Sequence, residues 1–377
     1  MSELLLNPEE LKSITEYCKK CGMCLSHCPI YEASDRLESV SPRGKLIIGL
    51  GLLSGELKLD EILSHKLMSC VLCSECVDFC PAGLDIPNLI LGARISSKVY
   101  EALPESLAKV IENIKTKGTP HGKDVMEKSK WFDLVGEVEK EGDVLLWSGC
   151  TSALTNPNLV ATAYNLLKKL EGGSVTALRN EPCCYAMYVY TGNLDAYKEE
   201  ILKVIERVKD AKAKVLVSLC PACTRSFRIY SKLVGIELPF RVLHVSEYLH
   251  EKLVKNGKKI ALPNPLTAAY HDPCTLVRGL GVKDKQREVL SSIENLKWLE
   301  MKGTRNCCGG GGAYGLYQPD WSAKISSRRL RDVPEGVKTI ITTCPTCEAT
   351  FKKAIKRENL DIEVKDLVTL VYEGLKE

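Results

Sequence analysis

The sequence predicts a multi-domain protein of the α and α/β class. An α-helical N-terminal domain with two cysteine motifs is followed by two tandem α/β domains with parallel sheets. Eight of the 18 cysteines form two copies of one motif within the first 80 residues, and the other ten form a five-cysteine set that recurs 124 residues later. Each five-cysteine set is embedded in alternating predicted strands and helices, which is the pattern of parallel βαβ units.

Composition places the chain among globular proteins and excludes several function classes. Its 377 residues, 45% hydrophobic and 27% charged, suffice for two or three domains with buried cores. The formal net charge of +4 is too small to indicate nucleic-acid binding. Residues 1–13 lack the regions of a secretory signal, and no apolar run approaches the roughly 20 residues of a transmembrane helix. We therefore expect a cytoplasmic protein without a transmembrane segment and without a nucleic-acid partner.

The N-terminal motif has the form C-x-x-C-x-x-C-x-x-x-C-P, which is the bacterial ferredoxin signature for two 4Fe–4S cubanes. In that arrangement three clustered thiolates bind one cubane and the fourth reaches across to the other. The expected ligand sets are therefore Cys18, Cys21, Cys24 and Cys80 for one cubane, and Cys70, Cys73, Cys76 and Cys28 for the other. Zinc sites or disulfides are the alternatives, but zinc sites usually combine two short-spaced pairs.

The gap between the two motifs predicts helices in place of the strands of a compact ferredoxin. Ser41 can cap a helix that Pro42 begins, and apolar residues recur at helical spacing in 59–69. We expect an α-helical ferredoxin domain over 1–100, a connector over 101–142, and two α/β domains over 143–262 and 263–377. The segment 261–266 is expected to form a short joint between the two α/β domains, and 283–296 a helix.

The ten remaining cysteines predict a duplicated domain. In each copy one cysteine ends a first strand, a pair follows the second strand, and a C-P-x-C motif follows the third. Because ligands collect outside the carboxyl ends of parallel strands, all five thiols of each unit are expected to converge. The two sets are Cys150, Cys183, Cys184, Cys220 and Cys223, and Cys274, Cys307, Cys308, Cys344 and Cys347.

Iron–sulfur ligation accounts for these ten cysteines better than the alternatives. A thioredoxin-like dithiol at C-P-x-C leaves three thiols of each unit unexplained, and a zinc ion uses four ligands where each unit offers five. The formal G-x-G-x-x-G match at Gly310, Gly312 and Gly315 lacks a clean strand-to-helix turn. We expect these glycines to bring backbone N–H groups close to cluster sulfurs. His271, beside Cys274, is the one histidine of interest, and a structural hydrogen bond is its ordinary explanation.

The five-cysteine unit resembles the cysteine-rich CCG domain of heterodisulfide reductase catalytic subunits. The whole arrangement is similar to the iron–sulfur subunits of glycolate oxidase and FAD-linked D-lactate dehydrogenases, and this similarity includes Ser41-Pro42-Arg43-Gly44, HDPCTLVRG (271–279) and CCGGGG (307–312). The resemblance implies two cubanes, one or two noncubane 4Fe–4S clusters, and no FAD bound by this chain.

The resemblance also implies a role and partners. The chain is expected to be the iron–sulfur subunit of an oxidoreductase complex. It would pass electrons between an FAD-binding 2-hydroxyacid dehydrogenase and a quinone, a carrier or a thiol/disulfide acceptor, with a membrane or quinone-linked subunit as a further partner. The alternative is a heterodisulfide reductase-type subunit whose noncubane cluster cleaves a disulfide. A zinc-stapled scaffold is a third hypothesis, from a different class.

One departure from the family pattern predicts different roles for the two units. Tyr185 follows the cysteine pair of the first unit, where the family has glycine, whereas the second unit retains the glycine run 309–312. A small residue lets an acceptor approach the cluster closely. The second unit, through Cys307 and Cys308, is therefore expected to carry the chemistry.

Overall fold

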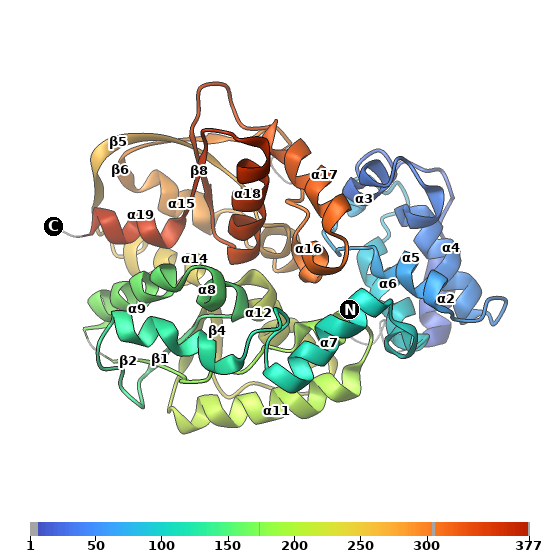
Figure 1. The fold of residues 1–377 in the computed structure, drawn as a ribbon, viewed down its shortest axis with the longest axis horizontal. Coiled ribbons are helices and arrows are strands. Elements are labelled where there is room, and N and C mark those ends of the chain that lie inside the picture. The colour runs from blue at the N-terminus through green and yellow to red at the C-terminus, as the bar shows by residue number, and fades with distance from the viewer. Residues whose placement is uncertain (1–6, 173, 304–305, 376–377) are drawn as a thin grey trace.

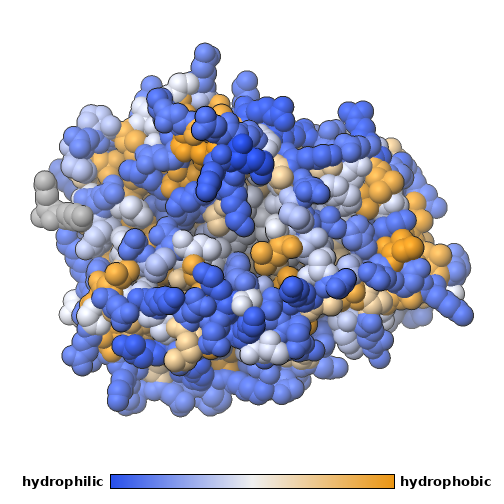
Figure 2. Space-filling model, viewed as in Figure 1, coloured by the Kyte–Doolittle hydropathy of each residue, from blue (hydrophilic) through white to orange (hydrophobic). Residues whose placement is uncertain are grey.

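A computed structural model describes residues 7–172, 174–303 and 306–375 of the chain. Figure 1 shows three parts: a helical N-terminal domain in blue, a first α/β unit mainly in green, and a second α/β unit in orange and red. The α/β units lie against each other, and the N-terminal domain lies beside both. Figure 2 shows a mostly hydrophilic surface with several hydrophobic patches over the N-terminal domain.

The N-terminal domain is helical, as the gap between its motifs predicts. Ser41 accepts a hydrogen bond from the backbone N–H of Gly44 at 2.9 Å, and Pro42 begins the helix. Asp60 caps the next helix by accepting from Leu63 N at 2.7 Å. The helices are α2 (Pro8–Glu16), α3 (Pro29–Ala33), α4 (Pro42–Leu53), α5 (Glu61–Met68) and α6 (Ile86–Ser96), with short turns η1 (Glu38–Val40), η2 (Glu75–Val77) and η3 (Val99–Ala102).

Two helices form the segment between this domain and the first α/β unit. Helix α7 (Glu105–Lys117) presents one apolar face, and η4 (Val125–Leu134) packs Trp131 and Phe132 into the core of the first unit. Element η4 lies against the helices that follow the first strand. Element η4 is therefore part of the first unit's packing, whereas α7 contacts α16 (Tyr314–Tyr317) of the second unit.

Both α/β units have a four-stranded parallel sheet with the same topology. The strand order is β2-β1-β3-β4 in the first unit and β6-β5-β7-β8 in the second. The strands are β1 (Val144–Trp147), β2 (Val175–Ala177), β3 (Val215–Ser218), β4 (Arg241–His244), β5 (Ile260–Tyr270), β6 (Ile293–Glu300), β7 (Thr339–Thr342) and β8 (Glu363–Asp366). The shared topology confirms the predicted parallel sheets.

Helices cover the sheets and join the units. In the first unit they are α8 (Cys150–Thr155), α9 (Pro157–Glu171), α10 (Ala186–Tyr190), α11 (Leu194–Asp210), α12 (Pro221–Arg225), η5 (Ser226–Tyr230), α13 (Ser231–Leu233), α14 (Val245–Leu249) and η6 (His250–Val254). In the second they are η7 (Thr275–Gly279), α15 (Lys285–Ser291), η8 (Gly311–Ala313), α16 (Tyr314–Tyr317), α17 (Pro319–Leu330), α18 (Pro345–Glu358) and α19 (Leu367–Gly374). One hydrophobic cluster contains residues of both sheets, so the two units share a core.

Two sequence expectations about this region are wrong. Residues 261–266 belong to strand β5 and do not form a joint. Pro263 and Pro265 are tolerated because β7 pairs only with Ala269 and Tyr270, and no partner of 262–265 is assigned on the β6 side. The helix expected over 283–296 ends at Ser291, and Ile293 begins the edge strand β6. Edge strands β4 and β8 carry no long apolar run and were not predicted.

Candidate functional site

The first thiol group, here named the outer site, brings Cys80 to the first motif. Cys18, Cys21, Cys24 and Cys80 line one small cavity of about 20 Å³. Cys21 is exposed, Cys18 and Cys80 are half-buried, and Cys24 is buried. Burial raises the pKa of Cys24 to about 11. The fourth cysteine of the second motif thus lies beside the first three of the first motif, which is the crossed grouping that the spacing predicts.

The second group, the inner site, brings Cys28 to the second motif. Cys28 interacts electrostatically with Cys70 and Cys73, and Cys76 interacts with all three. Burial raises the pKa of Cys28 to about 12, although the ammonium of Lys45 opposes this shift. Cys76 also interacts with Cys24 of the outer site, so the two groups are neighbours.

The five thiols of the first unit form a continuous chain of contacts. Cys150 contacts Cys183, which contacts Cys184, and from there the contacts continue to Cys223 and Cys220. Hydrogen bonds from Cys183 and Cys223 lower the pKa of Cys184 to about 5. All five thiols are buried.

The second unit repeats this chain at the equivalent positions. Cys274 contacts Cys307, Cys307 contacts Cys308, and the contacts continue to Cys347 and Cys344. Cys307 also donates a hydrogen bond to Cys73 of the inner site, which lowers the pKa of Cys73 to about 6. The inner site and the second unit's thiols are therefore in direct contact.

Backbone N–H groups point at the sulfurs of both cysteine pairs. Gly309 N donates to Cys307 Sγ at 3.3 Å, and Gly310 N donates to Cys308 Sγ at 3.4 Å. In the first unit, Tyr185 N donates to Cys183 Sγ at 3.4 Å. The start of the glycine run thus supplies N–H donors to cysteine sulfurs, and Tyr185 supplies one in the first unit, so this role does not itself require glycine.

Tyr185 has the backbone conformation for which the second unit uses glycine. Its φ is +54°, and Gly309, the equivalent residue, has a φ of +87°. The left-handed region is uncommon for a bulky residue, so the loop imposes this conformation in both units. The Tyr185 ring packs on Tyr188 with centroids 5.6 Å apart.

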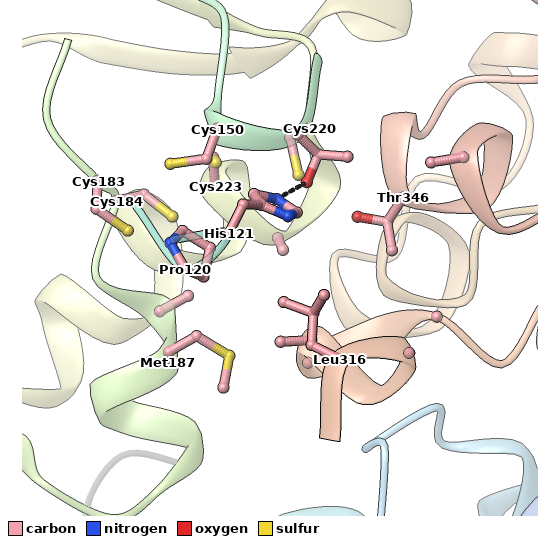
Figure 3. A pocket seen from close by; sticks show the side chains of 18 of the residues that line it. Pro120, His121, Cys150, Cys183, Cys184, Met187, Cys220, Cys223, Leu316 and Thr346 are labelled. Carbon is pink, nitrogen blue, oxygen red and sulfur yellow. Dashed lines mark hydrogen bonds between the residues drawn. The ribbon is translucent and has the colours of Figure 1, made fainter. Parts of the chain in front are cut away.

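A cavity of about 140 Å³ lies between the two units (Figure 3). All five first-unit thiols line one wall, with Met187 below them in the figure. The opposite wall comes from the second unit and includes Leu316 and Thr346, which the figure labels, and the glycines Gly310, Gly312 and Gly315. His121, whose Nε2 lies 3.2 Å from Thr151 Oγ1, closes one side. The cavity is thus flanked by first-unit thiols and by the loop that follows Cys308.

A buried ion pair missed by the sequence analysis lies beneath the first unit's thiols. Lys128 Nζ is 2.9 Å from Glu181 Oε1 and 3.7 Å from Cys150 Sγ, and both side chains are buried. The Glu181 carboxylate also accepts from the backbone N–H groups of Ser148 and Gly149 at 2.6 and 2.9 Å. Lys128 comes from η4, so the segment 101–142 contributes directly to this site.

His271 has a closer relation to the thiols than a purely structural hydrogen bond. One of its ring nitrogens and the sulfurs of Cys308 and Cys347 all lie within 4.8 Å of one another. Its Nδ1 accepts from Arg329 Nε at 3.3 Å. Trp147 occupies the equivalent position in the first unit, so that unit has no histidine at this place.

The residues present fit iron–sulfur clusters. Thiol groups of four, four, five and five match two ferredoxin-type and two five-cysteine centres. Buried N–H groups of Arg225 and Arg278 have no hydrogen-bond partner among the described residues. The charge of Arg278 interacts with Cys73, Cys274 and Cys307. Such unpaired donors next to thiols suit sites that hold anionic clusters.

Family comparisons agree with this division of the chain. A 4Fe-4S dicluster domain matches residues 14–84, and a cysteine-rich domain, CCG, matches residues 144–228 and 268–352. Among the described residues, no helix combines the length and hydrophobicity needed to cross a lipid bilayer.

Curated relatives resemble the chain over nearly its whole length. A dihydromethanophenazine:CoB–CoM heterodisulfide reductase subunit from Methanosarcina barkeri is 28% identical, covering 95% of this chain and 93% of that protein. The probable glycolate oxidase iron-sulfur subunit of Bacillus subtilis is 23% identical, covering 92% and 90%. Among solved structures, glutamate racemase isoform RacE1 of Bacillus anthracis aligns with a TM-score of 0.30 and 12% identity. The alignment covers 62% of this chain and 80% of that one. This similarity is too weak to support any conclusion.

Proposed function

We propose that this chain carries electrons from a flavoprotein partner to an acceptor. The chain belongs to the family of iron–sulfur subunits that combine a 4Fe–4S dicluster domain with two cysteine-rich CCG domains. The observation that carries the proposal is the continuity of the thiol groups. Cys24 of the outer site interacts with Cys76 of the inner site, and Cys73 of the inner site contacts Cys307 of the second unit. When bound, the clusters would supply one-electron carriers along this line.

The 18 cysteines are proposed as the ligands of these clusters. Each cubane would be held by one of the crossed sets of four thiols, and each CCG centre, cubane or noncubane, by five. The backbone N–H groups of the loops after Cys184 and Cys308 would stabilise the ligand sulfurs.

Electrons are proposed to enter at the outer site. Among the residues that the structure describes, Cys21 is the one exposed cysteine. Tyr17 and Met23, adjacent to the outer-site cysteines in the sequence, are 62% and 55% exposed. An exposed apolar surface beside a redox centre suits docking of a partner subunit. We propose an FAD-binding dehydrogenase of the 2-hydroxyacid type as that partner, with the flavin outside this chain.

The acceptor is proposed to bind in the cavity between the two units. Its walls carry apolar side chains such as Met187 and Leu316, together with Lys353 at the rim. A quinone, a carrier or a disulfide of matching size would lie between the first unit's thiols and the loop after Cys308. In this arrangement Cys307 and Cys308 would pass electrons toward the cavity, and Tyr185, whose ring packs on Tyr188, would not obstruct it.

A second candidate function is disulfide reduction. Relatives named as heterodisulfide reductase subunits cover 95% of this chain. The cavity is also lined by all five thiols of the first unit, beside which a disulfide would be cleaved. In this function two electrons reduce one disulfide, and two protons complete the two product thiols.

The deciding experiment is anaerobic purification of the chain from its host with its partners, followed by optical spectroscopy. The proposal predicts a co-purifying FAD protein and bleaching of the iron–sulfur absorbance when glycolate or lactate is added. Turnover with a disulfide in the absence of any flavoprotein would favour the second function. Full reduction by dithionite without any response to a partner or to a disulfide would contradict both.

The entry site has its own test. Met23→Asp should slow reduction by the flavoprotein without changing reduction by dithionite, because the charge disturbs docking only. Leu360→Asp, a matched change at an exposed residue of the second unit (38% exposed), should leave both rates unchanged. Equal rates for Met23→Asp and the unmodified protein would place electron entry elsewhere.

A further inference from the structure

Three buried cations surround the inner site. Lys45 and Arg94 are each 1% exposed, and the side chain of Arg278 is 6% exposed. They come from α4, α6 and η7, three elements distant in the sequence. Lys45 interacts with Cys28, Cys70 and Cys76. Such placement is costly unless negative charge lies nearby.

These cations are hydrogen-bonded to neutral groups. Arg94 donates to the carbonyl oxygens of Leu67, Cys70 and Tyr190 at 2.7, 2.6 and 3.0 Å. Lys45 donates to the carbonyl of Val40. In the described part of the chain, neither forms an ion pair with a carboxylate.

Arg278 is the least satisfied of the three. Its Nε donates to Cys73 O at 2.5 Å, while Nη1 and Nη2 have no hydrogen-bond partner among the described residues. The nearest carboxylate oxygen, on Glu75, is 4.0 Å from Nη2, which is too far for a hydrogen bond. The positive charge of the guanidinium therefore interacts with the thiols of Cys73 and Cys307.

The outer site has a different electrostatic environment. Arg43, which interacts with Cys24, is paired with Glu38 at 2.8 Å, so a carboxylate compensates its charge. Lys19 and Lys20 are exposed, and solvent screens their charges. No buried cation comparable to those at the inner site lies at the outer site among the described residues.

We infer that Lys45, Arg94 and Arg278 make the inner cubane the more easily reduced of the two, so that electrons received at the outer site pass inward. Each transfer moves one electron from the outer to the inner site, and no bond or proton is exchanged. Added negative charge is stabilised by nearby cations, and this stabilisation raises the reduction potential. Of the three, Lys45 and Arg94 have no carboxylate partner among the described residues, and Arg278 has only the Glu75 oxygen at 4.0 Å. The greater burial of the inner site opposes this effect. The inference rests on the proposed electron-transfer function and adds the direction of flow.

Arg278 gives the sharpest test, because a change there preserves the burial of the inner site. The potentials of both cubanes are measured by EPR on the anaerobically purified holoprotein at fixed solution potentials. Signals are assigned with Cys21→Ser for the outer cubane and Cys28→Ser for the inner one. The variants are Arg278→Gln, which removes the charge, and Arg278→Lys, which retains it. Arg328→Gln is the matched control, because its side chain is 58% exposed.

In the unmodified protein the inner cubane should have the higher potential. Arg278→Gln should lower the inner cubane's reduction equilibrium constant about tenfold, equivalent to about 59 mV for one electron, and leave the outer cubane unchanged. Arg278→Lys should recover most of this loss, and Arg328→Gln should shift neither cubane. A lower potential for the inner than for the outer cubane would overturn the inference, as would an unchanged inner potential in Arg278→Gln.

Loss of the inner cubane from Arg278→Gln would show in its iron content before any potential is measured. Lys45→Met then takes its place in the same experiment, with the same expected direction. Failure of the inference is distinct from failure of the proposed function. In the first case the clusters respond to the partner, but the two cubane potentials have the wrong order. In the second case dithionite reduces the clusters, but they respond neither to a flavoprotein partner nor to a disulfide.

Discussion

Cys307 of the second unit donates a hydrogen bond to Cys73 of the N-terminal domain. These two residues belong to different predicted ligand groups, and their contact brings the inner site directly to the second unit. Val71 packs against the same cluster, which also includes Cys274. Electron tunnelling falls off steeply with distance, so a direct contact between ligand residues is the arrangement that a relay requires. Under the proposed function, this contact would make the second unit the first CCG centre that electrons reach from the inner site.

The crossed ligation of the cubanes leads to a first prediction. Cys28→Ser should alter the EPR signal of the inner cubane, and Cys80→Ser that of the outer cubane, because each cysteine lies with the other motif's first three. Low-temperature EPR of the two reduced variants gives the comparison. Damage to the cubane nearest in sequence would show that each motif binds its cluster locally.

The order of the two CCG centres leads to a second prediction. Cys308→Ala should abolish turnover and leave the first-unit centre oxidised, because it interrupts the path between Cys73 and the cavity. Cys184→Ala should also abolish turnover, yet still allow the second-unit centre to be reduced. The glycine pattern alone predicts a milder effect for Cys184→Ala. The cavity lined by the first-unit thiols is the reason for the revised expectation.

Stopped-flow reduction followed by rapid-freeze EPR distinguishes these cases. Reduction of the first-unit centre in Cys308→Ala would mean that electrons reach it by another path. Normal turnover in Cys184→Ala would return the acceptor site to the second unit.

The buried pair Lys128–Glu181 leads to a third prediction, about stability. Lys128→Met leaves the Glu181 carboxylate buried beside thiols and should cost about 3–5 kcal/mol of unfolding free energy. The double variant Lys128→Met/Glu181→Gln removes both charges and should be less destabilised than the single variant. Anaerobic urea unfolding of the four proteins in this cycle measures the coupling. If the losses of unfolding free energy in the two single variants add up to the loss in the double variant, the pair contributes no coupling energy.

Asp366 leads to a fourth prediction, about pH. Burial, and then the charge of Glu348, raises the pKa of Asp366 to about 8. An unfolded aspartate titrates near about 3.9, so between these values the unfolded chain releases a proton that the folded chain retains. The contribution of protonated Asp366 to the free energy of unfolding is therefore fully present below about pH 4. It is lost as the pH rises toward about 8.

Asp366→Asn should reduce this loss, because the amide remains neutral and can still accept from Val368 N as the helix cap. Each pKa unit corresponds to about 1.4 kcal/mol, so the gain near pH 8 should be a few kcal/mol. Thermal unfolding between pH 5 and about pH 8 measures it. Asp361→Asn is the control, since that side chain is 86% exposed. Parallel pH profiles for Asp366→Asn and the unmodified protein would contradict the assignment.

The grouping of the cysteines was predictable because it depends only on the spacing of the cysteines in the sequence. The C-x-x-C-x-x-C-x-x-x-C-P motif specifies crossed sets, and the 124-residue offset specifies two equivalent units. Parallel strands then bring Cys150 and Cys220 to one edge of a sheet, which the strand pattern also predicts.

The charged residues around these groups were not predictable. Lys45, Lys128 and Arg278 look like ordinary surface residues in the sequence, and only the packing of distant elements buries them. Strands β4 and β8 were missed because Arg241–His244 and Glu363–Asp366 are short and carry charges on the edge of a sheet. The first half of β5 was not predicted as a strand because it contains Pro263 and Pro265. These prolines are tolerated there because this half does not pair with β7.

The content of iron and acid-labile sulfide per chain tests the central claim most directly. If all 18 cysteines bind clusters, two cubanes and two four-iron CCG centres give about 16 iron per chain, with a matching amount of sulfide. The measurement is made on protein purified anaerobically, with zinc determined in the same sample. The account predicts about 16 iron and little zinc, whereas about 12 iron would mean that one CCG unit lacks its cluster. Stoichiometric zinc with little iron would contradict the account.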